Sequence, residues 1–157
     1  MSQMNNTNVS PTSQVEALLE EWKKDVQIDR TSPADDVRKI GLLHSKYLNI
    51  LSTHRRALKE NERKAIKFRR LKYEYYMGRL DSPTLEKYKW EPFPYTLKTG
   101  DLTTYMESDT ELLNAKAVLA NHEEIISVCE SIMKELNNRT WQMKEICGWE
   151  KFISGVH

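Results

Sequence analysis

The stretch from Pro33 to Met77 contains no second proline and only one glycine, Gly41. Ser32 at the N-cap and Pro33 at the first helical position form a strong start signal, and Gly78 is a typical C-terminal cap. The sequence therefore predicts one helix over residues 33–77, about 67 Å long at 1.5 Å per residue. Because a compact chain of this length is only about 40 Å across, either this helix kinks or the protein is elongated and completed by neighbouring copies.

Capping signals and periodicity predict further helices on both sides of this stretch. A first helix begins at Ser13, which forms a capping box with Glu16, and ends within residues 28–32. A short helix is predicted over residues 82–88, and residues 93–97 could be extended. A second capping box, Ser108 with Glu111, begins a long helix that ends near residue 136.

That long helix carries a heptad seam of a little more than three heptads. Its members are Leu112, Ala115, Leu119, His122, Ile126, Cys129, Met133 and Leu136. The pair Asn137 and Asn138 is expected to interrupt the helix, and a last helix is predicted over residues 141–154.

These elements define an all-α fold class with long amphipathic helices. We expect residues 1–14 to be a flexible tail, residues 15–107 an N-terminal helical region, and residues 108–157 a C-terminal helical region. Leu, Ile, Val and Phe together make up little more than a fifth of the chain, so its hydrophobic core is small for its length. A small core with many charged residues suits helices that form subunit contacts better than a compact enzyme.

Several classes of protein are not expected. No apolar run approaches the length of a membrane span, residues 1–14 lack the apolar segment of a signal peptide, and two distant cysteines do not form a disulfide framework. The chain has no phosphate-binding glycine loop, no nucleophile motif and no metal-ligand spacing. We therefore expect no catalytic residues, no metal and no cofactor, and a semi-buried packing role for His44 and His54.

Charge is concentrated in one segment of a chain whose formal net charge is only +1. Residues 55–79 contain ten basic and three acidic side chains. On a helix, five of these cations fall on one face, within an arc of about 80°. We call them the basic row: Arg56, Lys59, Arg63, Lys67 and Arg70.

The spacing of the basic row, about 5–6 Å along the helix axis, can follow a sugar-phosphate backbone. The alternative interpretation is a solvated helix face, because most runs of charged residues lie on such faces. Few glutamates balance the row, and Tyr73, Tyr75 and Tyr76 follow it closely. Cations beside aromatic rings are typical of single-strand nucleic-acid binding.

The last helix carries a second unusual surface. Five apolar residues cover one of its sides: Trp141, Ile146, Trp149, Phe152 and Ile153. This is too much apolar surface to leave in water. Either the helix folds back on the same chain, or it forms a homo-oligomer interface.

Several segments together resemble the UvsY family of recombination mediators from T-even-type phages. They are residues 22–29 (WKKDVQID), residues 43–49 (LHSKYLN), residues 75–79 (YYMGR) and residues 143–146 (MKEI), followed by Phe152 and Gly155. Their order and spacing carry the resemblance, which covers about residues 17–155. The N-terminal tail and the loop at residues 92–94 depart from the family pattern.

The resemblance implies a small helical protein without enzymatic activity. It implies binding to single-stranded DNA, to the phage single-strand-binding protein and to the phage recombinase, which it would load onto covered DNA. It also implies a ring-like homo-oligomer of six or seven subunits held by C-terminal sequence, in the cytoplasm of the infected bacterial host.

The family's DNA-binding motif, Lys-Ala-Arg-Leu, aligns with residues 70–73, which read Arg-Leu-Lys-Tyr here. Charge is kept at Arg70 and Lys72, although the two residue types are exchanged. The candidate nucleic-acid-binding residues are thus Arg56, Lys59, Arg63, Lys67, Arg70, Lys72, Tyr75 and Arg79. The alternative function is a non-enzymatic helical adaptor whose basic helix binds an acidic protein partner.

Overall fold

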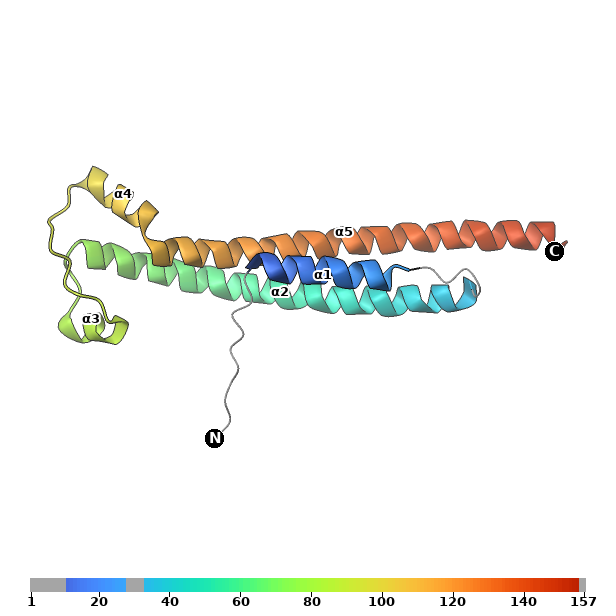
Figure 1. The fold of residues 1–157 in the computed structure, drawn as a ribbon, viewed down its shortest axis with the longest axis horizontal. Coiled ribbons are helices and arrows are strands. Elements are labelled where there is room, and N and C mark those ends of the chain that lie inside the picture. Colours follow the sequence, from blue (N-terminus) through green and yellow to red (C-terminus); the bar gives the residue numbers. More distant parts are fainter. Residues whose placement is uncertain (1–10, 28–32, 156–157) are drawn as a thin grey trace, which may run out of the picture. The chain divides into compact units, whose positions relative to one another are not determined.

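The computed structural model describes residues 11–27 and 33–155, and within these ranges every regular element is a helix. In chain order they are α1 (Pro11–Asp25), α2 (Pro33–Tyr76), α3 (Ser82–Tyr88), α4 (Thr99–Ser108) and α5 (Thr110–Ile153) (Figure 1). The predicted all-α class is confirmed. Most of the predicted N-terminal tail and the Ser32 cap lie outside the described residues.

The chain divides into two units, and α2 and α5 contribute to both. One unit comprises residues 1–56 and 121–157, and the other comprises residues 57–120. The 44 residues of α2 form one uninterrupted helix, and no proline follows Pro33 within it. No helix among the described residues is both long and apolar enough to cross a bilayer.

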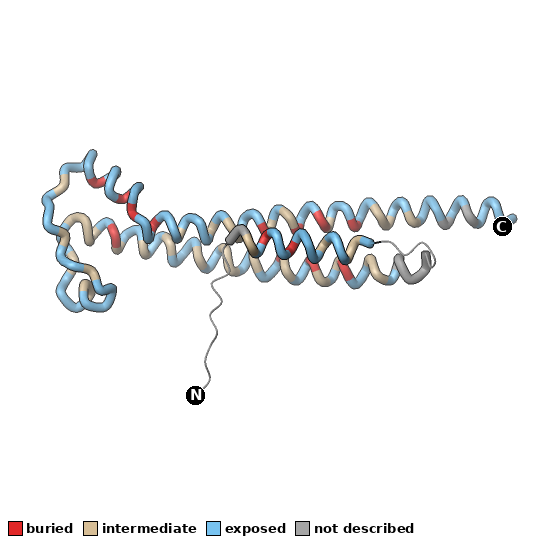
Figure 2. Tube along the Cα trace, viewed as in Figure 1, coloured by how far each residue is buried: buried red, intermediate tan, exposed pale blue. Residues whose placement is uncertain are grey.

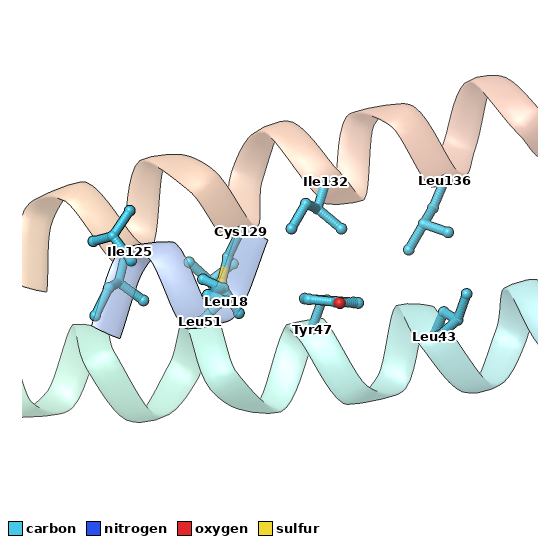
Figure 3. Packing of buried hydrophobic residues seen from close by; sticks show 9 residues of the cluster. Leu18, Leu43, Tyr47, Leu51, Ile125, Cys129, Ile132 and Leu136 are labelled. Carbon is cyan, nitrogen blue, oxygen red and sulfur yellow. The ribbon is translucent and has the colours of Figure 1, made fainter. Parts of the chain in front are cut away.

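The first unit is built from α1 packed against α2 and α5. Figure 3 shows side chains from all three helices meeting in one core, with Leu43, Tyr47 and Leu51 of α2 facing α5. Tyr47 is fully buried and its ring meets Trp22 edge-on, with centroids 5.5 Å apart. Full burial of each aliphatic side chain contributes about 1.5–3 kcal/mol, so this core anchors α1 to the two long helices.

The seam of α5 differs from the prediction in this unit. Ile125 and Ile132 are buried together with Cys129 and Leu136, whereas Ile126 and Met133 are only partly buried. The reason is that α5 packs against two helices here, so its buried face is wider than the seam of a two-helix coiled coil.

The ends of α1 also differ from the prediction. The helix begins at Pro11, so Ser13 lies in its first turn and not at the cap, since proline suits the first turn by its fixed φ and missing N–H. It ends at Asp25, earlier than predicted. The Asp25 carboxylate accepts hydrogen bonds from Lys46 Nζ at 2.5 Å and from the Tyr47 hydroxyl at 2.9 Å, which fix this end against α2.

The second unit contains the stop of α2, which the sequence located correctly. Gly78 has a φ of +66°. Its N–H bonds the carbonyl of Tyr75 at 3.0 Å, and the N–H of Arg79 bonds that of Glu74 at 2.9 Å. This is the Schellman arrangement, which favours glycine because the residue adopts a left-handed conformation. The predicted short helix over residues 82–88 is confirmed as α3.

The structure after α3 differs from the prediction at α4, which was not predicted, and at the cap of α5. Residues 93–97, which could be extended, form no regular element. The cap of α5 is Asp109, whose Oδ1 accepts the Leu112 N–H at 2.9 Å. The Ser108 hydroxyl instead donates to the Thr104 carbonyl at 2.8 Å, because Ser108 ends α4.

The second half of α5 corrects a further prediction. Asn137 and Asn138 do not interrupt the helix, which continues to Ile153. Asparagine costs only a fraction of a kcal/mol relative to alanine inside a helix, and no proline adds to that cost. Figure 2 shows that the described part of α5 beyond these residues is mostly exposed.

Candidate nucleic-acid interface

The basic row lies on the exposed face of α2. Lys59, Arg63, Lys67 and Arg70 belong to the second unit, and all four are exposed. Arg56, the last α2 residue of the first unit, is exposed as well. The sequence placed these five side chains on one helix face, and α2 is helical throughout.

The basic row differs from its basic neighbours on α2 in the ion pairs that the described residues form. Within the part of the chain that the structure describes, none of the five forms an ion pair. The neighbouring cations that do pair lie outside the row: Lys64 with Glu60 at 2.6 Å, and Arg55 with Glu130 at 2.5 Å. The Lys64 hydrogen bond lowers the pKa of Glu60. The row is therefore available to an anionic ligand.

Lys72 does not join this surface, although the sequence made it a candidate. Its side chain is only 6% exposed, and its ammonium lies 3.0 Å from Asp109 Oδ2 and pairs with Glu111 as well. The same ammonium lies 4.0 Å from the centroid of the Trp90 ring, within cation–π range. The Lys72 charge is thus used inside the unit and does not face solvent.

Asp109 is the centre of this buried network. Burial alone would raise the pKa of its carboxyl, but hydrogen bonds from Tyr76, the Leu112 N–H and Lys72 outweigh burial and lower it. The Tyr76 hydroxyl donates to Asp109 at 2.7 Å, and its pKa is raised by burial and by this carboxylate. The network ties the end of α2 to the start of α5.

The predicted aromatic residues follow the same inward pattern. Tyr75 is partly buried, and its ring lies 5.0 Å from Trp90 and 5.7 Å from Phe93, centroid to centroid. Tyr76 contacts Phe93 edge-on at 5.0 Å. Tyr75 is therefore part of the packing of the unit, whereas Arg79, just after the helix, is exposed.

Sequence reasoning missed a cavity beside the basic row. It has a volume of about 490 Å³. Its lining comprises Asn61, Lys64, Ala65, Lys67, Phe68, Leu71, Tyr88, Ala115 and Val118. Lys67 belongs to both the row and this cavity. Tyr88, the aromatic residue in the short helix, was the only sequence signal for this cavity. The proximity of Tyr88 to α2 depends on tertiary packing.

The apolar side of the C-terminal part of α5 is exposed. The exposed fractions of Trp141, Ile146, Trp149, Phe152 and Ile153 are 69%, 48%, 65%, 73% and 68%. The rings of Trp149 and Phe152 stack with centroids 5.9 Å apart. Among the described residues, this side does not pack into a core of the same chain. The predicted alternative in which the last helix folds back on its own chain therefore does not hold there.

The histidines and Cys129 offer little chemistry. The Nδ1 atoms of His54 and His122 lie 2.9 Å apart, and both residues are partly buried, as is His44. No cluster of three or more metal-ligating side chains occurs within residues 11–27 and 33–155. Cys129 is buried, and burial raises the pKa of its thiol, which disfavours the reactive thiolate.

Comparison with known proteins finds a protein family that matches most of the chain. The family model described as "Recombination, repair and ssDNA binding protein UvsY" matches residues 21–156. The recombination protein uvsY of Enterobacteria phage T4 is 24% identical over 141 residues, which cover 90% of this chain and 98% of that protein.

Solved structures of the bacteriophage T4 recombination mediator protein UvsY have the same fold. One crystal form gives a TM-score of 0.74 at 24% identity, covering 88% of this chain and 98% of that one. A second crystal form gives a TM-score of 0.72, covering 88% and 96%. These likenesses show the fold, and the family match places the chain in the class of recombination, repair and single-stranded-DNA-binding proteins. Within that class it belongs to the UvsY family.

Proposed function

We propose that this protein is a recombination mediator that binds single-stranded DNA along the basic row. In this role it helps to load a phage recombinase onto DNA covered by single-strand-binding protein, without catalysis of its own. Its partners are single-stranded DNA, the recombinase, the single-strand-binding protein and further copies of itself. It acts in the cytoplasm of the infected bacterial host.

One observation carries the proposal: an exposed row of cations that form no ion pair with the described residues, in a member of a family that binds single-stranded DNA. Cations one helical turn apart meet successive phosphates without reading base edges, so the binding is tolerant of sequence. Arg70 is the residue of the row that also aligns with the family's DNA-binding motif. Lys72 is left out of the interface because its charge is buried.

Assembly completes the proposal. The exposed apolar side of α5, from Trp141 to Ile153, forms the homo-oligomer interface, and six or seven copies form a ring. Each copy of the basic row binds DNA weakly, but linked copies gain avidity through effective concentration. A strand held along several copies loses contacts with its covering protein, which gives the recombinase a place to start.

Titration of the full-length protein with a fluorescent oligonucleotide tests this function. We expect binding below micromolar concentration at low salt, little dependence on base sequence, and a large loss when Lys59, Arg63, Lys67 and Arg70 are all changed to alanine. The absence of binding below micromolar concentration at low salt would reject DNA binding and favour the adaptor, in which the row contacts an acidic protein.

A further inference from the structure

The cavity beside the basic row has the size and composition of a ligand site. Its volume of about 490 Å³ lies within the range of small-molecule pockets. Most of its lining is apolar, with Phe68 and Leu71 from α2, Tyr88 from α3, and Ala115 and Val118 from α5. An apolar site bordered by lysines suits a flat, weakly polar group attached to an anion.

Tyr88 supplies an aromatic surface that is already fixed in place. Its ring stacks on Trp90 with centroids 4.9 Å apart and an interplanar angle of 25°. Trp90 is held in turn by Phe68 at 6.1 Å and by the buried ammonium of Lys72 at 4.0 Å. Tyr88 nevertheless stays 37% exposed, so part of its ring is available for contact. Because these contacts already order the ring, a ligand binds without much loss of side-chain entropy.

Cations predominate around this cavity, although one of them, Lys64, is paired with Glu60. Lys64 and Lys67 line it, and the ammonium of Lys87 lies 5.4 Å from the Tyr88 ring centroid. No carboxylate is among the described residues that line it. The cavities along the other flank of the row differ, because Glu107 lines both of them and Glu62 lines one. An anionic ligand is therefore favoured on the Tyr88 side.

We propose that the Tyr88 cavity is a nucleobase subsite for single-stranded DNA. One base leaves the strand, enters the cavity and stacks against Tyr88, while the phosphate next to it binds Lys67, the residue that the cavity and the basic row share. This inference rests on the proposed function and adds a contact with the base to a surface that otherwise contacts only the backbone. Any base stacks on an aromatic ring, so the subsite tolerates all sequences.

The test compares an oligonucleotide of thymidines with an abasic oligonucleotide of the same length, using fluorescence anisotropy at low salt. Full-length wild-type protein should bind the thymidine strand more tightly. Tyr88→Ala should weaken binding to the thymidine strand by roughly 5- to 100-fold, the value of one base–aromatic stack. Its binding to the abasic strand should stay unchanged, because no base is lost there. Tyr88→Phe should behave like wild type.

Tyr95→Ala is the matched control, because Tyr95 is an exposed tyrosine in the segment between α3 and α4 and lines none of these cavities. It should bind both strands like wild type. Equal losses on both strands with Tyr88→Ala would mean a structural role and would overturn the subsite. A base-dependent loss of binding with Tyr73→Ala but not with Tyr88→Ala would also overturn the subsite, because Tyr73 lies on the other flank of the row. Failure of the wild type to bind either strand would instead reject the proposed function itself.

Discussion

The Lys72 ammonium lies 3.0 Å from the Asp109 carboxylate, and both side chains are nearly inaccessible to solvent. Lys72 occupies a cationic position of the family's DNA-binding motif, yet here its charge holds the start of α5 against the end of α2. Arg70, two residues earlier, is exposed. The two cations of the motif therefore lie in different environments: Lys72 is buried in an ion pair, whereas Arg70 faces solvent, where we propose that it contacts DNA.

This separation predicts different effects for the two alanine variants. Lys72→Ala leaves the Asp109 carboxylate buried without its cation, which should lower the free energy of unfolding by about 3–5 kcal/mol. Arg70→Ala should leave stability nearly unchanged, because its side chain is exposed, but should weaken DNA binding. Urea denaturation and oligonucleotide titration of both variants measure the two effects.

Lys64→Ala is the control for the first of these measurements. Its ion pair with Glu60 is exposed, so its loss should change stability little. A Lys72→Ala variant as stable as the wild type would contradict the structural role of the buried pair.

Acid should destabilise the first unit through His54. Burial and the neighbouring His122 lower the pKa of His54 below its ordinary value of 6.5. A histidine with a lowered folded-state pKa stabilises the fold above its unfolded-state pKa, and this contribution is lost as the pH falls below that value. The urea midpoint should therefore decrease between pH 7.5 and pH 5.5, and His54→Gln should remove most of that decrease. A midpoint independent of pH in the wild type would contradict the His54 contact.

Salt should weaken DNA binding in proportion to the number of phosphates contacted. If the five residues of the basic row each contact a phosphate, the logarithm of affinity should fall with the logarithm of salt concentration at a slope of about −3.5 per binding unit. Removing Arg63 should reduce the magnitude of the slope by about 0.7. Titrations at several salt concentrations measure this slope. An affinity that does not change with salt would exclude the basic row as the contact surface.

Deleting residues 141–157 should disrupt assembly without unfolding the protein. Trp141, Ile146, Trp149, Phe152 and Ile153 are exposed in this segment, and both clusters of buried residues lie outside it. Burial of Trp141, Trp149 and Phe152 in an interface would contribute a few kcal/mol per ring. Sedimentation velocity should show a smaller, still helical species, and that species should bind DNA more weakly because avidity is lost. A full-length protein that is monomeric at micromolar concentration would contradict both the ring and the avidity.

Features set by local sequence could be predicted, and those set by tertiary contacts could not. Three local signals located their elements: the lack of proline after Pro33 in α2, the cap at Gly78, and the proline at the start of α3. Each signal acts within a few residues. The cap at Asp109 depends on Tyr76 and Lys72, more than thirty residues earlier, so the local Ser108 signal was misleading.

The candidate site shows the same division. Helical periodicity alone placed the basic row on one face. The same projection puts Lys72 about 220° from Lys59, on the opposite side of α2. The positive charge of Lys72 and its alignment with the family motif predicted a DNA contact, although this angle places the side chain away from the basic row. The Tyr88 cavity could not be found from the sequence, because three separated helices form it.

Recombinase assembly on covered DNA tests the central claim most directly. Single-stranded DNA is first saturated with the single-strand-binding protein, and the time course of recombinase filament formation is then recorded with and without this protein. The account predicts that wild-type protein shortens the lag, and that a variant with Lys59, Arg63, Lys67 and Arg70 changed to alanine does not, although it folds and assembles normally. A wild type without effect, or a variant as active as the wild type, would contradict the claim that the basic row of α2 mediates loading.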